Sequence, residues 1–105
     1  MTEEHAIQNA IRLALKDICV MFRINVGSAR TINGNYFTTG VPKGFSDLFG
    51  FRKSDGKAVF IEVKTPKGRA SKEQLRFIEK MIADGAIAGI CRSTEDALRL
   101  VNGGK

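Results

Sequence analysis

An acid and a base stand two positions apart inside an apolar stretch of this 105-residue chain. Glu62 and Lys64 belong to the run Ala58-Val59-Phe60-Ile61-Glu62-Val63-Lys64-Thr65, whose composition is typical of a strand covered on both faces. Side chains alternate along a strand, so Glu62 and Lys64 lie on one face, about 7 Å apart. Burying an ionised group without a partner is costly. The pair therefore indicates either a structural ion pair whose lysine reaches solvent or a site that performs chemistry.

A second acid is expected near this pair because of a hairpin. Asp47 precedes an apolar strand at residues 48–51, and the turn Lys53-Ser54-Asp55-Gly56 leads back into the strand that bears Glu62. An Asp-Gly pair favours a tight turn between antiparallel strands. Asp47 lies eight residues before that pair and Glu62 six residues after it. Pairing across the hairpin should therefore bring the two carboxylates near each other.

A first amphipathic helix should pack on these strands. Apolar residues recur at helical spacing over residues 3–20, with Thr2 as the N-cap. The same apolar stripe reaches back to Glu4, and Glu3 lies just to one side of it. Glu4 would then overhang the packed face of the helix. Acids in a first turn also complement the helix dipole, so both interpretations of Glu4 stand.

A second helix begins with a capping box. Ser71-Lys72-Glu73-Gln74 has the side chains that cap a helix reciprocally, and Asp84-Gly85 ends the helix. Gln74 shares a stripe with Phe77 and Ile78, so its amide should point toward the sheet. Gln74 therefore either only closes the capping box or also joins the polar groups at the end of the sheet.

Together these side chains favour a site for a divalent cation. Those expected to converge at one end of the sheet are Asp47, Glu62, Lys64, Glu4 and Gln74. Carboxylates with backbone carbonyls and water form the oxygen-only site that Mg²⁺ or Mn²⁺ prefers. Such an ion polarises a phosphodiester, stabilises negative charge in the transition state and lowers the pKa of a bound water. Lys64 would orient or deprotonate that water, or neutralise charge on the phosphate.

The charge of the chain favours a polyanionic partner. The formal net charge is +6, and ten Lys or Arg against five Asp or Glu lie between Lys43 and Lys80. Nucleic acid or an acidic membrane surface would match this charge. The polar stretch from Gly27 to Gly40 also carries Arg30 and two aromatic residues. It is expected to be a long hairpin or loop, which either contacts nucleic acid or is solvated with its aromatic rings in the core.

The chain is expected to be one domain that stays inside the cell. A length of 105 residues suits a single core over residues 1–105. The sequence has no signal peptide and no apolar run of about 18 residues, which predicts a cytoplasmic protein rather than a secreted or membrane-bound one. Cys19 and Cys91 lie in apolar segments and are expected to be buried thiols, not metal ligands together with His5.

The predicted element order is α-β-β-β-α-β-α. A strand–helix–strand crossover from Glu62 to Cys91 implies a parallel strand pair, whereas the earlier strands should be antiparallel. The sequence therefore predicts an α/β fold with a mixed sheet and helices packed on it.

The central block of the sequence resembles a known family. Gly40-Val41-Pro42-Lys43-Gly44-Phe45-Ser46-Asp47 is followed by Phe60-Ile61-Glu62-Val63-Lys64-Thr65-Pro66-Lys67-Gly68-Arg69, with Gln74 downstream. This block resembles the VRR-NUC family of the PD-(D/E)xK nuclease superfamily, and the resemblance covers nearly the whole chain. Ser46 stands where the superfamily has a proline before the motif aspartate. The resemblance implies a restriction-endonuclease-like mixed sheet.

The resemblance also implies a set of metal ligands. Asp47 and Glu62 would bind the metal, and the Val63 carbonyl would be a further ligand. Glu4 would be the acid of the first helix, although Glu3 remains an alternative for that place. Mg²⁺ or Mn²⁺ is the implied cofactor.

The remaining roles and the activity follow from the same resemblance. Lys64 would be the catalytic lysine and Gln74 the supporting glutamine. Members of the family are structure-dependent DNA nucleases, so the implied activity is a metal-dependent endonuclease that hydrolyses branched or structured DNA. Stand-alone domains of this size are similar to Holliday-junction resolvases, which implies a homodimer whose symmetry matches a four-way junction.

Two other classes of function remain as alternatives. One is a non-catalytic nucleic-acid-binding module, and the other is a structural protein in which the acid and lysine form a buried ion pair. Acids in a phosphate-binding groove repel phosphate unless a cation joins them, which argues against the binding module. The residues expected to contact DNA phosphates, with strong salt dependence, are Lys43, Lys67, Arg69, Lys72 and Arg30.

Overall fold

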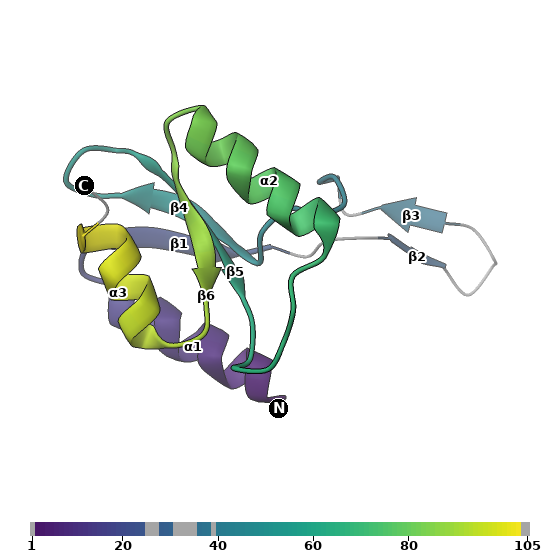
Figure 1. The fold of residues 1–105 in the computed structure, drawn as a ribbon, viewed down its shortest axis with the longest axis horizontal. Coiled ribbons are helices and arrows are strands. Elements are labelled where there is room, and N and C mark those ends of the chain that lie inside the picture. The colour runs from purple at the N-terminus through teal and green to yellow at the C-terminus, as the bar shows by residue number, and fades with distance from the viewer. Residues whose placement is uncertain (1, 25–27, 31–35, 39, 104–105) are drawn as a thin grey trace.

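We describe the protein from a computed structural model, in which the described residues are 2–24, 28–30, 36–38 and 40–103. A four-stranded sheet has helices on both faces (Figure 1). The helices are α1 (Glu3–Leu15), α2 (Lys72–Ala83) and α3 (Thr94–Gly103). The strands of this sheet, in spatial order, are β1 (Cys19–Arg23), β4 (Leu48–Arg52), β5 (Ala58–Val63) and β6 (Ile87–Cys91). A separate two-stranded sheet consists of β2 (Ser28–Arg30) and β3 (Tyr36–Thr38).

The sheet is mixed, as the sequence predicts. β1 pairs with β4 and β4 with β5 in antiparallel fashion, whereas β5 and β6 are parallel. The crossover between the parallel strands is α2, which covers one face, while α1 and α3 pack side by side on the other (Figure 1). The element order of the four-stranded sheet and its helices confirms the predicted α-β-β-β-α-β-α arrangement.

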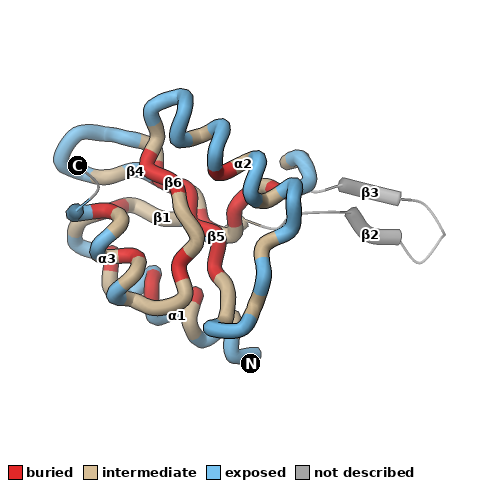
Figure 2. Tube along the Cα trace, in the orientation of Figure 1, coloured by how far each residue is buried: buried red, intermediate tan, exposed pale blue. Residues whose placement is uncertain are grey.

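The central strand β5 separates two apolar cores. Val59, Ile61 and Val63 pack with α1 and α3 in the larger core, and Phe60 packs beneath α2 in the smaller one. Figure 2 shows the buried positions concentrated along β5 and its neighbours. The predicted alternation along this strand is confirmed. Because the face of Phe60 is also the face of Glu62, an ionisable residue lies at the end of the apolar layer under α2.

The β4–β5 hairpin turns at residues 53–56 as the sequence predicts, and its pairing is centred between Ser54 and Asp55. Leu48 lies opposite Ile61, and the turn closes with an Arg52 N–H that donates to the Lys57 carbonyl, 2.8 Å away. Gly56 has φ +74°, a conformation that glycine adopts without steric strain. This register brings the residue before β4 beside the carboxyl end of β5.

A cluster of phenylalanines fixes the segment that leads into β4. The ring of Phe45 lies 4.8 Å from that of Phe77 on α2 and 5.9 Å from that of Phe60, measured between centroids. Gly44 has φ +92°, and a Cβ there would come within 2.6 Å of the Glu73 carbonyl oxygen in the first turn of α2. The segment therefore runs directly against the beginning of α2, which places Asp47 and α2 at the same end of the sheet.

The first helix is shorter than the sequence predicts. Thr2 caps α1 as expected, since its Oγ1 accepts a hydrogen bond from the His5 N–H. The helix ends at Leu15 rather than at residue 20, because residues 16–18 turn the chain into β1. β1 therefore begins at Cys19, which lies opposite Arg52 of β4. Pairing with β4 thus decides the start of this strand, and an apolar pattern alone does not reveal such long-range pairing.

The expected hairpin or loop between Gly27 and Gly40 contains the short strands β2 and β3, which pair in antiparallel fashion. Residues 25–27, 31–35 and 39 lie outside the described residues, and so does the side chain of Arg30. Cys19 and Cys91 are buried free thiols as expected. Across the described ranges, every helix is too short or too polar to span a bilayer.

We predict that Gly50→Ala strongly destabilises the fold. A Cβ at this position of β4 would collide with the backbone carbonyl of Val20 on β1, so the two strands would have to separate, at a cost of about 3 kcal/mol. Thermal unfolding should show a large drop in Tm. The matched control is Gly103→Ala in α3, where a new Cβ would lie 3.8 Å from its nearest neighbour. Equal losses in the two variants would contradict the close approach of β1 and β4.

Candidate active site

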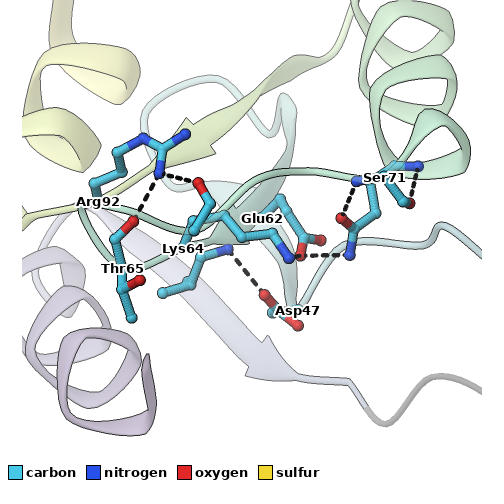
Figure 3. A network of polar contacts seen from close by, with 9 residues as sticks. Asp47, Glu62, Lys64, Thr65, Ser71 and Arg92 are labelled. Atoms are coloured by element: carbon cyan, nitrogen blue, oxygen red, sulfur yellow. Dashed lines mark hydrogen bonds and ion pairs between the residues drawn. The ribbon is translucent and has the colours of Figure 1, made fainter. Parts of the chain in front are cut away.

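Glu62 is the most buried charged side chain near the end of β5. Its exposed fraction is 1%, and its Oε2 accepts hydrogen bonds from Gln74 Nε2 at 2.8 Å and lies 3.3 Å from Lys64 Nζ (Figure 3). Within the described part of the chain, Glu62 Oε1 has no hydrogen-bond partner. Buried polar oxygens in folded proteins are nearly always satisfied, so this atom is available to a ligand that binds beside Asp47.

The surroundings of Glu62 favour its neutral form in the metal-free protein. Burial, and after it the nearby Asp47 charge, raise the pKa of this carboxyl to about 8, although Lys64 opposes both. Desolvation and a like charge each disfavour the ionised state. A divalent cation beside the two carboxylates would reverse this preference.

Asp47 is tied to the strand that carries Glu62. It precedes β4, and its Oδ2 accepts a hydrogen bond from the backbone N–H of Val63, 2.9 Å away (Figure 3). The hairpin register predicted that Asp47 and Glu62 would be neighbours, and the structure brings them together. Ser46 is fully buried, and its Oγ donates to the Leu48 carbonyl at 2.8 Å. This hydrogen bond fixes the backbone at the position where a proline would otherwise restrict it.

Gln74 performs both of the roles that the sequence left open. Its backbone N–H donates to Ser71 Oγ, and its Oε1 accepts the Ser71 N–H at 2.8 Å, which completes the capping box. Its Nε2 is then directed at Glu62 (Figure 3). The start of α2 and the orientation of the buried carboxylate are therefore fixed by one side chain.

Lys64 follows the last residue of β5 and lies at the rim of the site. Its side chain is 15% exposed, and its backbone N–H donates to the Cys91 carbonyl, 3.1 Å away. This hydrogen bond continues the β5–β6 pairing past the end of the strand. The ammonium group thus lies between the buried carboxylate and solvent, where a substrate phosphate could reach it.

The donor set of this site fits a hard divalent cation. Two carboxylates lie beside each other, one of them with a buried oxygen that has no hydrogen-bond partner among the described residues, and carboxylate oxygens are the ligands that Mg²⁺ and Mn²⁺ prefer. Residues 4–95 match the sequence model of the VRR-NUC domain. The chain belongs to the VRR-NUC domain family. This membership confirms the family that the motifs predict, and it identifies a nuclease-type domain.

A solved structure described as a VRR_NUC domain shares the fold of this VRR-NUC chain. The two superpose with a TM-score of 0.67 at 19% sequence identity, and the match covers 96% of each chain. At this identity the likeness shows the fold, which confirms the predicted restriction-endonuclease-like mixed sheet. No curated protein matches the sequence.

The first helix of this VRR-NUC domain does not bring a third carboxylate to the pair. Across the described ranges, no group of three or more His, Cys, Asp or Glu residues is placed to hold a metal ion. Glu4 is half-buried in the first turn of α1, and Glu3 is exposed. The polar residue that α1 buries is Gln8, one turn later, with an exposed fraction of 5%. A metal-binding role for Glu4 therefore stays a prediction.

The basic residues predicted to contact DNA differ in their partners. Lys67, Arg69 and Lys72 are exposed and form no ion pair within the residues that the structure describes. Lys43 lies 3.9 Å from Glu73 in an exposed pair, which is expected to contribute little. Three of the predicted DNA contacts are thus uncompensated positive charges.

Sequence reasoning missed Arg92. This residue lies between β6 and α3, and its Nη1 donates to the carbonyls of Thr65 and Gly68 (Figure 3). No motif marks Arg92 in the sequence, because its partners are backbone atoms more than twenty residues away. One signal was available in the sequence: Arg92 is a basic residue that directly follows the strand expected to pair with the strand of Glu62.

We predict that Glu62→Gln becomes increasingly more stable than wild type as pH rises. In the metal-free protein the folded-state pKa of Glu62, about 8, exceeds its ordinary value of 4.5. Between these two pH values the folded state keeps a proton that the unfolded state has lost. The free energy of unfolding of wild type therefore decreases as pH rises through this range. Thermal unfolding in chelator from about pH 5 to about pH 9 should show a growing gap that levels off above the folded-state pKa. A pH-independent gap would contradict the raised pKa.

Proposed function

We propose that this VRR-NUC domain is a Mg²⁺- or Mn²⁺-dependent endonuclease that hydrolyses phosphodiester bonds in branched or otherwise structured DNA. The observation that carries the proposal is the buried Glu62 carboxylate, which lies beside Asp47 and has one oxygen without a partner among the described residues. A structural ion pair alone would not need a second carboxylate here, because a like charge makes ionisation harder.

The residues that would hold the ion are Asp47, Glu62 and the carbonyl of Val63. A bound Mg²⁺ or Mn²⁺ would polarise the phosphodiester and stabilise the negative charge of the transition state. Gln74 holds Oε2 of Glu62 in place, and this bond leaves Oε1 available as a ligand. Preorganising a ligand in this way lowers the cost of binding.

Lys64 is the residue proposed to act on the reacting groups. Its Nζ lies 3.3 Å from Glu62 Oε2 and is partly exposed, so it can donate hydrogen bonds outward while the carboxylate orients it. We propose that it positions the attacking water or neutralises charge on the phosphate. Both roles require the ammonium to stay beside the carboxylates.

The exposed bases Lys67, Arg69 and Lys72, with Lys43 and Arg30, would bind DNA through its phosphates. Such contacts position the backbone and carry little sequence information, which fits an enzyme that selects DNA by its structure. We further propose that residues 1–105 act as one nuclease domain in the cytoplasm. Two copies in a symmetric homodimer would present two sites to a four-way junction.

We predict metal-dependent cleavage that Glu62→Gln and Lys64→Met abolish. Labelled four-way junction, flap, duplex and single-stranded DNA would be incubated with Mg²⁺, Mn²⁺ or EDTA. Each substitution should lower the rate by at least about a hundredfold, since each removes a group that stabilises the reacting phosphate. Paired symmetric nicks on the junction would support the dimeric resolvase.

The matched control is Glu79→Gln, the same acid-to-amide change on the exposed side of α2, which should leave the rate unchanged. If wild type binds these DNAs and cuts none with either metal, the catalytic proposal fails. The non-catalytic nucleic-acid-binding module would then be the better account.

We predict that Mn²⁺ or Mg²⁺ raises the Tm of wild type and does so much less in Asp47→Asn. A ligand that binds only the folded state stabilises it by mass action, by about 2.7 kcal/mol at a hundred times its dissociation constant. Asparagine can still accept the Val63 N–H, so the fold should survive. Asp17→Asn, at an exposed position, is the control. Equal metal-induced shifts in wild type and Asp47→Asn would contradict the proposed ligands.

A further inference from the structure

Arg92 forms hydrogen bonds with both ends of a basic turn, Thr65 to Gly68, that directly follows Lys64. Its Nη1 donates to the Thr65 carbonyl at 2.7 Å and to the Gly68 carbonyl at 2.6 Å (Figure 3). The Gly68 N–H also donates to the Thr65 carbonyl, 3.0 Å away, and closes the turn. A charged donor that bridges two carbonyls makes stronger hydrogen bonds than a neutral one. The guanidinium therefore determines the shape of this turn.

Arg92 is itself held by the strand and helix that it joins. Its backbone N–H donates to Asp96 Oδ2 at 2.9 Å, and Asp96 Oδ1 accepts a hydrogen bond from Arg99. The preceding residue, Cys91, accepts the Lys64 N–H through its carbonyl. The turn is thus anchored to the junction of β6 and α3 rather than to another loop. An anchor on regular elements is more rigid than one on loops.

The turn presents two cations to solvent. Lys67 lies within it and Arg69 follows it, and both are exposed. Several other surface bases are paired, such as Lys16 with Asp17 and Lys80 with Asp84, but neither Lys67 nor Arg69 has an acidic partner in the described part of the chain. Two free charges on a fixed turn beside Lys64 are suited to phosphates that neighbour the reacting one.

We propose that Arg92 is a positioning residue that holds the turn from Thr65 to Gly68 so that Lys67 and Arg69 bind DNA phosphates next to the cleaved one. This role rests on the proposed nuclease function. Arg92 acts through the turn, because its Nη1 donates to the two carbonyls that fix the shape of the turn. Without Arg92, the turn and its two cations must become ordered on binding, which costs affinity.

The first test measures DNA binding by Arg92→Met, Lys67→Ala/Arg69→Ala and the triple variant, using fluorescently labelled four-way junction across a salt series. Arg92→Met should weaken binding about tenfold, the ordering cost of two long side chains. The triple variant should bind as the double variant does, because groups that act as a unit are not additive. Arg12→Met, which removes the same charge from the exposed surface of α1 near the end of that helix, is the control and should bind normally.

The second test measures how accessible the turn is to a protease in the absence of DNA. Trypsin should cleave after Lys67 or Arg69 faster in Arg92→Met than in wild type or Arg12→Met, because the turn is more accessible without the hydrogen bonds from Arg92. Arg92→Lys, which keeps the charge and can donate to the carbonyls from a shorter side chain, should restore both protection and binding in part. At saturating DNA, Arg92→Met should keep its kcat and show the loss in KM.

Three results would overturn this role while the proposed nuclease stands. They are normal DNA binding by Arg92→Met, unchanged trypsin cleavage in Arg92→Met, and a loss that adds fully to that of the double variant, which would mean that Arg92 contacts DNA itself. Failure of wild type to bind or cut any DNA would overturn the proposed function and this role together. The wild-type measurements therefore distinguish a failure of the Arg92 role from a failure of the proposed nuclease function.

Discussion

The burial of one carboxylate on the central strand is the constraint on which the rest of this site depends. Glu62 continues the apolar face of β5 that packs under α2, where an ionised group without a partner is costly. The chain gives it a hydrogen bond from Gln74, an ammonium from Lys64 and, beside it, a second carboxylate from Asp47. The last of these makes ionisation harder. A fold optimised only for stability would not place a second acid there, whereas a fold that receives a divalent cation requires one.

Each secondary-structure element near the site contributes by bringing one group to the end of β5. The hairpin register places Asp47, which accepts the Val63 N–H. The capping box of α2 fixes Gln74 through Ser71 and so orients the buried carboxylate. The last residue of the parallel strand β6, Cys91, accepts the N–H of Lys64 and so holds its backbone. Local capping and strand pairing thus determine the geometry of the site, and the helices on the other face support it by filling the larger core.

The parts of the site that follow from local rules could be predicted from the sequence. Period-two alternation placed Glu62 and Lys64 on one face, and the capping box located Gln74. Two positions could not be predicted in this way. Glu4 lies on the predicted apolar stripe, but whether a helix end reaches the sheet depends on how far along its axis the helix is docked, which tertiary packing decides. Arg92 binds backbone carbonyls of a distant turn, and no residue pattern encodes such a contact.

The proposal that Glu62 binds a divalent cation and stays neutral until the ion binds is tested most directly by calorimetry of Mn²⁺ binding in buffers of different ionisation enthalpy. Because metal binding requires a deprotonated carboxylate and the pKa of Glu62 is raised to about 8, binding at about pH 6.5 should release close to one proton per ion. Release should vanish at about pH 9.5 and should be absent in Glu62→Gln. Binding without proton release at the lower pH, or binding that Glu62→Gln leaves unchanged, would contradict the account.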